Sequence, residues 1–155
     1  MKTIIENERE IPIYAEVDVL VCGGGPAGIG AAIRAGRLGM KTMIVEMQYC
    51  LGGMATAGLM SHWVGRSSSK VMQEIFSRTK EKGKILGWEE ENKCEDFYIH
   101  HEAQKIVIEE MMRESNVEIL YGTIVCGCVM EGNKVKGIFA ENKSGRICIL
   151  SKCVI

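Results

Sequence analysis

The order of hydrophobic and polar positions divides the chain into alternating strands and helices. Apolar runs within residues 17–22 and 41–46 contain β-branched residues and lack a helical period, which is typical of buried parallel strands. Residues 27–38 carry apolar residues at helical spacing, and Gly39 then ends the helix. These segments together have the length of a βαβ unit, about 30 residues.

The second half of the chain begins with helices and ends with strands. Helices are predicted at residues 69–82 and 100–115, where apolar residues form a stripe, and a strand is predicted at 117–121. Residues 84–96 are polar and predict a loop. Three β runs follow, at residues 123–130, 134–140 and 146–152, with turns at 131–133 and 141–145 between them. The predicted fold class is α/β, with a parallel sheet and an antiparallel β-meander.

The two ends of the chain are predicted to differ in character. Residues 1–15 read as a leader with a short strand or arm at residues 11–14. Residues 153–155 are apolar and read as the opening of another buried strand, so the sequence is expected to be truncated.

Composition and charge narrow the class of protein. A length of 155 residues suits one domain, and 46% hydrophobic with 25% charged residues is usual for a globular core. A net charge of −1 gives no reason to expect nucleic acid or an anionic membrane as partner. No apolar run reaches the roughly 20 residues of a membrane span. Seven cysteines with no secretory signal predict reduced thiols in the cytoplasm.

The glycine-rich segment between the first strand and helix has the chemistry of a diphosphate site. Gly23 allows a tight turn, Gly25 allows an anion to approach the backbone, and Gly28 allows the helix to pack closely on the strand. The first helical N–H groups, around Pro26, Ala27 and Gly28, would point at the anion, and the helix dipole favours negative charge there. Gly24 lies within the same turn.

Glu46 ends the second strand, 18 residues after Gly28. A carboxylate there can accept hydrogen bonds from both ribose hydroxyls, and it would repel a 2′-phosphate. The residues therefore favour FAD or NAD over NADP. A glycine motif alone is weak evidence, but here the strand, helix, second strand and carboxylate all follow in order.

Residues 17–59, from the first strand through Leu51-Gly52-Gly53-Met54 to Leu59, resemble the FAD-dependent oxidoreductases of the glutathione-reductase-like superfamily. They are most similar to the group related to fumarate reductase flavoproteins. Residues 118–125 and 132–138 are similar to that family's strand and β-meander. The resemblance implies a Rossmann-like three-layer FAD-binding domain over residues 1–155, which would be the N-terminal portion of a typical member.

The resemblance also implies the cofactor contacts. Residues 23–28 would cradle the FAD pyrophosphate, and Glu46 would hold the adenosine ribose. Gly52, Gly53 and Met54 would lie along the pyrophosphate and ribityl side, and Val125 would meet the adenine through its backbone. The family's substrate domain and later flavin contacts have no counterpart here, so a partner chain or further sequence would complete the flavin site. The substrate and the catalytic residues stay unidentified.

Other polar residues are expected to have structural roles. Cys126 and Cys128 are predicted to be small core residues, because no second pair lies at metal-ligand spacing, and no metal site is predicted. Cys50 precedes the Gly52-Gly53 pair without the second cysteine of a dithiol mechanism. His62 and Trp63 could approach the flavin, although loop contacts are favoured. The remaining expectations are a helix boundary at His100 and His101, core packing at Met111 and Met112, and a solvated loop at residues 89–91.

Two alternatives to a flavin oxidoreductase stay open. One is a non-catalytic or truncated nucleotide-binding module that needs a partner chain. The other is an NAD-binding dehydrogenase domain, against which residues 51–59 argue, because a simple dinucleotide domain does not need them.

Overall fold

The computed structural model describes residues 2–4, 8–60, 63, 69–87 and 99–155. In chain order its elements are β1 (Ile13–Cys22), α1 (Pro26–Arg37), β2 (Thr42–Val45), the short 3₁₀ helix η1 (Gly53–Ala55), α2 (Lys70–Ile85), α3 (His101–Glu114), β3 (Val117–Leu120), β4 (Ile124–Glu131), β5 (Lys134–Asn142) and β6 (Gly145–Val154).

The strands form one mixed sheet in the order β3-β2-β1-β6-β5-β4. β3, β2, β1 and β6 are parallel neighbours, whereas β6, β5 and β4 pair in antiparallel fashion. The meander therefore connects β3, on one side of β1, to β6 on its other side. β6 is shared by the parallel and the antiparallel parts.

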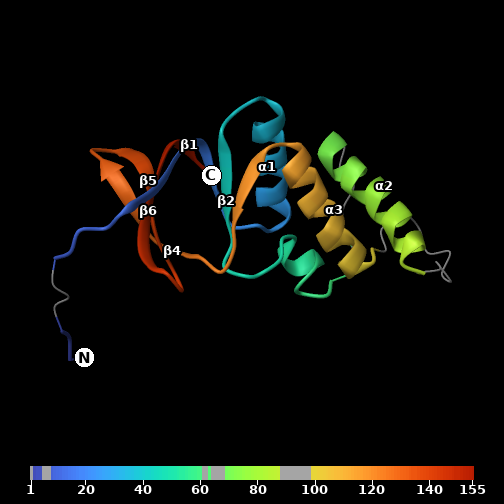
Figure 1. Ribbon diagram of the computed structural model, residues 1–155, viewed down its shortest axis with the longest axis horizontal. Coiled ribbons are helices and arrows are strands. Elements are labelled where there is room, and N and C mark those ends of the chain that lie inside the picture. Colours follow the sequence, from blue (N-terminus) through green and yellow to red (C-terminus); the bar gives the residue numbers. More distant parts are fainter. Residues whose placement is uncertain (1, 5–7, 61–62, 64–68, 88–98) are drawn as a thin grey trace.

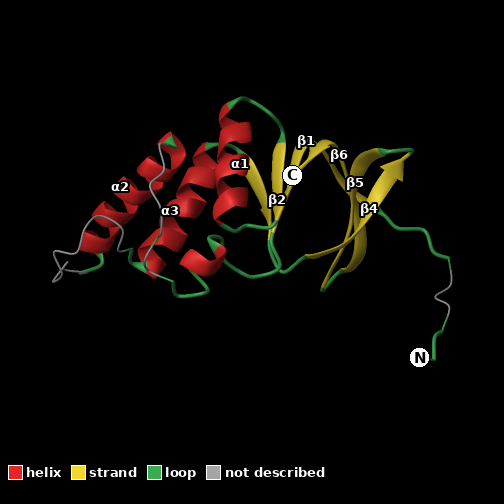
Figure 2. Cartoon of the chain, turned by 180° about the vertical axis from the view of Figure 1, so that it is seen from behind, coloured by secondary structure: helices red, strands yellow, loops and turns green. Residues whose placement is uncertain are grey.

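The helices, the parallel strands and the meander make three layers (Figure 1). The parallel strands in the middle are buried on both faces. Val21 and Ile44 pack into a core with the helices, whereas Leu20 and Met43 pack into a second core with the meander. Figure 2 shows the helices together on one side and β4, β5 and β6 on the other. This arrangement confirms the predicted α/β class, with a parallel sheet and a β-meander crossover.

The helix layer is closely packed and joined by ion pairs. A Cβ atom on Gly36 of α1 would collide with the carbonyl oxygen of Ser115, so this glycine lets α1 approach the end of α3. Met111 and Met112 are fully buried, as predicted. Ile106, which the sequence places in the same apolar stripe, is 40% exposed, and Gln104 is buried in its stead.

Several predicted boundaries need correction. β1 begins at Ile13, so the expected short strand near residues 11–14 is part of it. α2 runs on to Ile85, into the segment predicted as a polar loop. Cys153 and Val154 do not open a new strand, because they end β6 and pair with β1. The sequence pattern could not distinguish a new strand from the end of β6, because β6 changes its neighbouring strands while its alternation of side chains continues.

Candidate functional site

The glycine turn connects β1 to α1 at the carboxyl end of the parallel strands. Gly23 has φ +108°, a backbone conformation that residues with a side chain rarely adopt. Its N–H donates to the carbonyl oxygen of Val45 at 2.8 Å. A Cβ atom on Gly28 would collide with the carbonyl oxygen of Gly23. A Cβ atom on Gly25 would meet nothing within 4 Å in the described part of the chain. The turn is thus packed tightly on its inner side and open at Gly25.

The N-terminus of α1 is open to a ligand. Gly25 is its N-cap, and Pro26 occupies the first turn. Among the described residues no side chain caps this end, and the first turn contains no acidic residue, whereas Arg34 and Arg37 lie in the last turn. The orphan N–H groups and the positive end of the helix dipole, around Ala27 and Gly28, are therefore available to an anion.

Glu46 lies beside the turn and is only 9% exposed. One carboxylate oxygen accepts the N–H of Gly24 at 2.6 Å, and the other accepts the N–H of Gln48 at 2.8 Å. The bond from Gly24 was not foreseen from the sequence: it fixes the carboxylate at the turn and gives Gly24 a supporting role. Each carboxylate oxygen can accept more than one hydrogen bond, so Glu46 keeps capacity for hydroxyl donors.

The segment after β2 packs against the same turn. The N–H of Gly52 donates to the carbonyl oxygen of Gly24 at 2.7 Å, and a Cβ atom on Gly53 would lie 3.2 Å from the Cα of Gly25. Gly52 has φ +107° and Gly53 has φ +54°, so both positions favour glycine. Met54 follows and is 62% exposed. Gly52 and Gly53 thus pack against Gly24 and Gly25, and Met54 follows them in the chain.

Val125 is the second residue of β4, and the loop before β4 connects it to the site. The N–H of Thr123 donates to the carbonyl oxygen of Glu46 at 3.1 Å, two residues before Val125. Val125 pairs with Ala140, and a register shift follows at Gly127. The structure therefore brings the start of β4 to the end of β2, near Glu46.

The cysteines of β4 were predicted wrongly. Cys126 and Cys128 are exposed and not in the core, because β4 is the edge strand of the sheet and much of its surface faces outward. The six cysteines that the structure describes have free thiols. Burial raises the pKa of the Cys22 thiol, directly before the turn. In the described residues no three potential metal ligands come together.

The aromatic and histidine candidates lie elsewhere or outside the described residues. The ring of Trp63 packs edge-on against Phe76 of α2, with 5.2 Å between ring centroids. His62 and residues 89–91 lie outside the described residues. His100 is the N-cap of α3, and its Nδ1 accepts the N–H of Ala103 at 3.1 Å, which confirms the predicted helix boundary.

Sequence reasoning missed a cleft that lies between β1, the residue before β2 and the strands of the meander. β6 pairs with β5 up to Leu150 and with β1 as far as Val154, so the tip of the β4–β5 hairpin diverges from β1. The cleft there has a volume of about 600 Å³ and is lined by residues that include Asp18, Lys41, Lys136 and Lys152. Lys152 donates to Asp18 and lowers the pKa of its carboxyl group. No sequence signal reports this cleft, because it depends on strand register.

Comparison with known proteins identifies the class to which this site belongs. The model of the FAD dependent oxidoreductase family matches residues 18–155, almost the whole chain. The chain therefore belongs to the FAD dependent oxidoreductase family. FAD is the cofactor of this family, in agreement with the glycine turn and Glu46.

Relatives within this class differ in activity. A mitochondrial dihydrolipoyl dehydrogenase of Schizosaccharomyces pombe is 30% identical over 70% of this chain and 22% of its own length. A thiamine thiazole synthase of Methanococcus vannielii is 27% identical over 92% of this chain and 53% of its own length. The crystal structure of Thermovibrio ammonificans THI4 shares the fold, with a TM-score of 0.61 and 19% identity over 90% of this chain and 56% of that one. The chain spans about half or less of each relative's length.

The residues of the turn fit FAD. An FAD pyrophosphate needs backbone N–H donors and space beside them, and Gly25 supplies that space at the uncapped end of α1. The adenosine ribose needs an acceptor for its hydroxyls, and a carboxylate such as Glu46, fixed beside the turn, is an acceptor of this kind. Within the described residues, no helix combines the length and apolar character needed to cross a membrane.

Proposed function

We propose that this chain binds FAD through its adenosine diphosphate half and forms the FAD-binding part of a flavin-dependent oxidoreductase. One observation carries the proposal: Gly25 faces open space at the uncapped N-terminus of α1, and the N–H of its neighbour Gly24 fixes the carboxylate of Glu46. A diphosphate and a ribose hydroxyl are the groups that these two sites accept. FAD, when bound, supplies hydride or electron transfer.

The chain's own residues bind and orient the cofactor in this proposal. The backbone N–H groups of Ala27 and Gly28 face the pyrophosphate, whereas Pro26 has no N–H and contributes its fixed φ. Gly52, Gly53 and Met54 guide the chain of the cofactor away from the turn, and Val125 meets the adenine through its backbone. Gly24 acts through Glu46, because its N–H holds that carboxylate.

Residues 1–155 form one FAD-binding domain in this proposal, and the remaining flavin contacts come from further sequence or a partner chain. The substrate lies outside what these residues recognise, since the relatives that share the fold carry different activities. The free thiols of the described cysteines support a reducing compartment, the cytoplasm.

The test is FAD affinity in two glycine variants of α1. Gly25→Val fills the proposed phosphate space, and we expect at least about a hundredfold loss of FAD affinity, comparable to the loss of several hydrogen bonds to a charged group. Gly30→Ala is the matched control, since its added Cβ also meets nothing within 4 Å of the described chain. Isothermal titration calorimetry measures both affinities, and circular dichroism confirms that each variant folds.

Equal FAD affinity in wild type and Gly25→Val would contradict the assignment of the site. Selective binding of NAD over FAD by the wild type would favour a dehydrogenase domain instead. No binding of either dinucleotide would contradict the proposal as a whole.

A further inference from the structure

Three segments of the chain meet at the carboxyl end of β2, beside Glu46. The N–H of Gly122 donates to the carbonyl oxygen of Gln48 at 3.3 Å, next to the bond between Thr123 and Glu46. The side chain of Asn142 then donates to the hydroxyl of Thr123 at 3.3 Å. The segment after β2, the segment before β4 and the β5–β6 turn therefore form one cluster.

Tyr49 is held in this cluster although most of its surface is exposed. A Cβ atom on Gly122 would lie 2.8 Å from the Tyr49 hydroxyl oxygen and 3.0 Å from a ring carbon, so the ring rests directly on the backbone of Gly122. Gly122 has φ +59°, a conformation that favours glycine. Tyr49 is nevertheless 68% exposed. A large ring is thus pre-positioned with little of its area covered.

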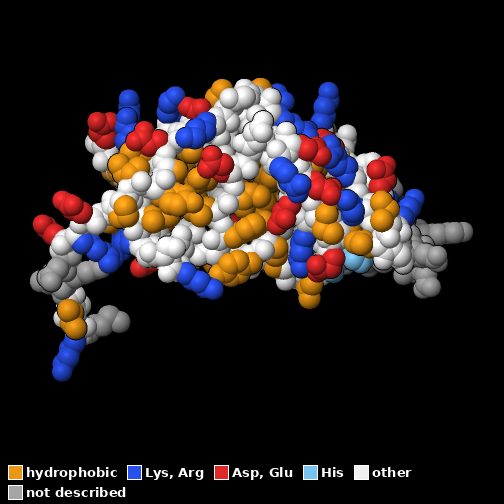
Figure 3. Space-filling view, in the orientation of Figure 1, with side chains coloured by type: hydrophobic (Ala, Val, Ile, Leu, Met, Phe, Trp, Pro, Cys, Tyr) orange, Lys and Arg blue, Asp and Glu red, His pale blue; other side chains and the backbone are white. Residues whose placement is uncertain are grey.

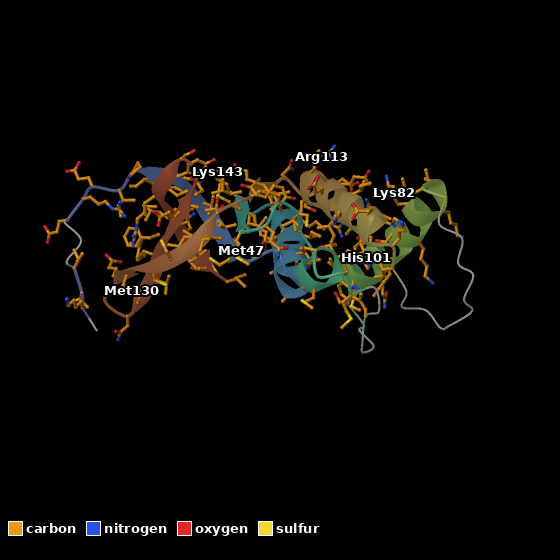
Figure 4. The ribbon with its side chains drawn as sticks, turned by 90° about the horizontal axis from the view of Figure 1, so that it is seen from below. Met47, Lys82, His101, Arg113, Met130 and Lys143 are labelled. Carbon is orange, nitrogen blue, oxygen red and sulfur yellow. The ribbon has the colours of Figure 1, made fainter. Side chains whose placement is uncertain are left out.

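Lys143, in the β5–β6 turn, supplies a cation at the same place. Its Nζ lies 5.6 Å from the centroid of the Tyr49 ring, within the range of a cation–π contact. In Figure 4, Met47 and Lys143 lie closer to the middle of the molecule than Met130, which lies toward the far end of the meander. Tyr49 follows Glu46 closely in the chain, so the ring and the ammonium group beside it lie near the end of β2.

We propose that Tyr49 and Lys143 form the outer wall of the adenine subsite and select a purine base. The inference rests on the proposed function, in which the nucleoside extends from Glu46 toward Val125. Thr123 links these two positions, and its neighbour Gly122 carries the Tyr49 ring. The ring offers apolar area to the purine, and the Lys143 ammonium donates a hydrogen bond to a ring nitrogen, which is an acceptor.

The chemistry of the pair matches a base rather than a phosphate. The carboxylate of Glu46 lies on the same segment as Tyr49 and disfavours a second anion beside the ribose. An aromatic ring that is already fixed loses little conformational entropy on binding, so its contact area contributes to affinity. Both properties suit a flat, uncharged heterocycle.

The experiment compares a probe with a base and a probe without one, using the 155-residue chain. ADP contains the base, ribose and diphosphate, and ribose 5-diphosphate lacks only the base. We expect Tyr49→Ala to weaken ADP binding by about tenfold, the effect of one lost base–aromatic contact, and to leave ribose 5-diphosphate binding unchanged. Lys143→Ala is expected to act in the same direction, and Tyr49→Phe to retain wild-type affinity within about twofold.

Matched controls come from the chain itself. Tyr14 in β1 is another exposed tyrosine, and Lys134 is an exposed lysine in the β4–β5 hairpin. Tyr14→Ala and Lys134→Ala should leave both affinities unchanged.

Three results would overturn the inference, and they differ in meaning. Unchanged ADP affinity in both Tyr49→Ala and Lys143→Ala refutes the wall and leaves the proposed function intact. Equal losses for ADP and ribose 5-diphosphate refute base recognition, because the substitution then disturbs the sugar and phosphate sites. If the wild type binds neither ADP nor FAD, the proposed function fails and the inference fails with it.

Discussion

Gly25 and Gly28 lie close together in the glycine turn, and each position requires a glycine for a different reason. Gly28 is required inside the protein, since a Cβ atom there would strike the carbonyl oxygen of Gly23. Gly25 faces open space, so its lack of a side chain matters only to something that approaches from outside. The glycine spacing in the sequence does not distinguish Gly25 from Gly28. Only the structure shows that one faces open space and the other is needed for packing.

This difference predicts the stability of Gly28→Ala. The added methyl group forces the turn away from α1, and we expect the free energy of unfolding to fall by about 2 kcal/mol, a usual cost of overpacking. Gly30→Ala should instead raise it by about 0.5 to 1 kcal/mol, because alanine is the better helix former. Urea denaturation followed by circular dichroism measures both, and a Gly28→Ala variant as stable as wild type would contradict the packing role.

Glu46 predicts which nucleotides are refused. Its carboxylate is fixed by Gly24 and Gln48 and would lie beside any 2′-phosphate. We expect wild type to prefer ADP over adenosine 2′,5′-bisphosphate, and Glu46→Gln to reduce that preference by at least about tenfold, through the loss of one charge–charge repulsion. Competition against FAD measures the ratio. An unchanged ratio would mean that Glu46 does not face the ribose.

At the scale of elements, an ion-pair network joins the three helices. Glu74 of α2 pairs with Arg37 of α1 at 2.6 Å and with Arg78 at 2.7 Å, and Arg78 pairs with Glu114 of α3 at 2.7 Å. Figure 3 shows both charges interspersed over the helices, whereas hydrophobic side chains gather over the strands. The ion pairs therefore stabilise the helix layer at its surface, in addition to the packing of the hydrophobic core beneath it.

The network predicts how stability changes with pH. The hydrogen bond from Arg37 lowers the pKa of Glu74 below its usual value of 4.5. A lowered pKa in the folded state means that the stabilisation is fully present above that value and is lost as the pH falls through the lowered one. We expect Glu74→Gln to be less stable than wild type by about 1 kcal/mol at pH 7, with the difference shrinking toward pH 3 and in high salt.

Thermal unfolding across this pH range measures the difference. Glu81→Gln, at an exposed position on the same helix, is the control and should follow the wild type at every pH. A stability gap between Glu74→Gln and wild type that stays constant down to pH 3 would contradict the electrostatic explanation.

For the whole molecule, local features were predictable and distant pairings were not. The turn at Gly23, the helix after it and Glu46 follow from residues close in sequence, so pattern predicts them. The bond between Gly24 and Glu46 and the contact of Tyr49 with Gly122 join segments that only the sheet brings together. The exposure of Cys126 likewise depends on β4 being an edge strand, which residue order alone does not determine.

The glycine turn and the charged cleft occupy different parts of the molecule. The glycine turn lies at the carboxyl end of β1, whereas the charged cleft includes Lys41, directly before β2, and Lys152 of β6. Parallel α/β sheets bind their ligands at the carboxyl edge, where helix N-termini point. The proposed FAD site at the glycine turn lies at this edge.

The most direct test follows the backbone amide resonances of the ¹⁵N-labelled chain while FAD is added. We expect Ala27, Gly28 and Gln48, whose N–H donates to Glu46, to shift with a common dissociation constant, and ADP to shift the same residues. The amide resonances of the cleft residues should not shift; these residues are Lys41, Lys136 and Lys152. Shifts confined to those three lysines, with the glycine turn unchanged, would contradict FAD binding at the turn.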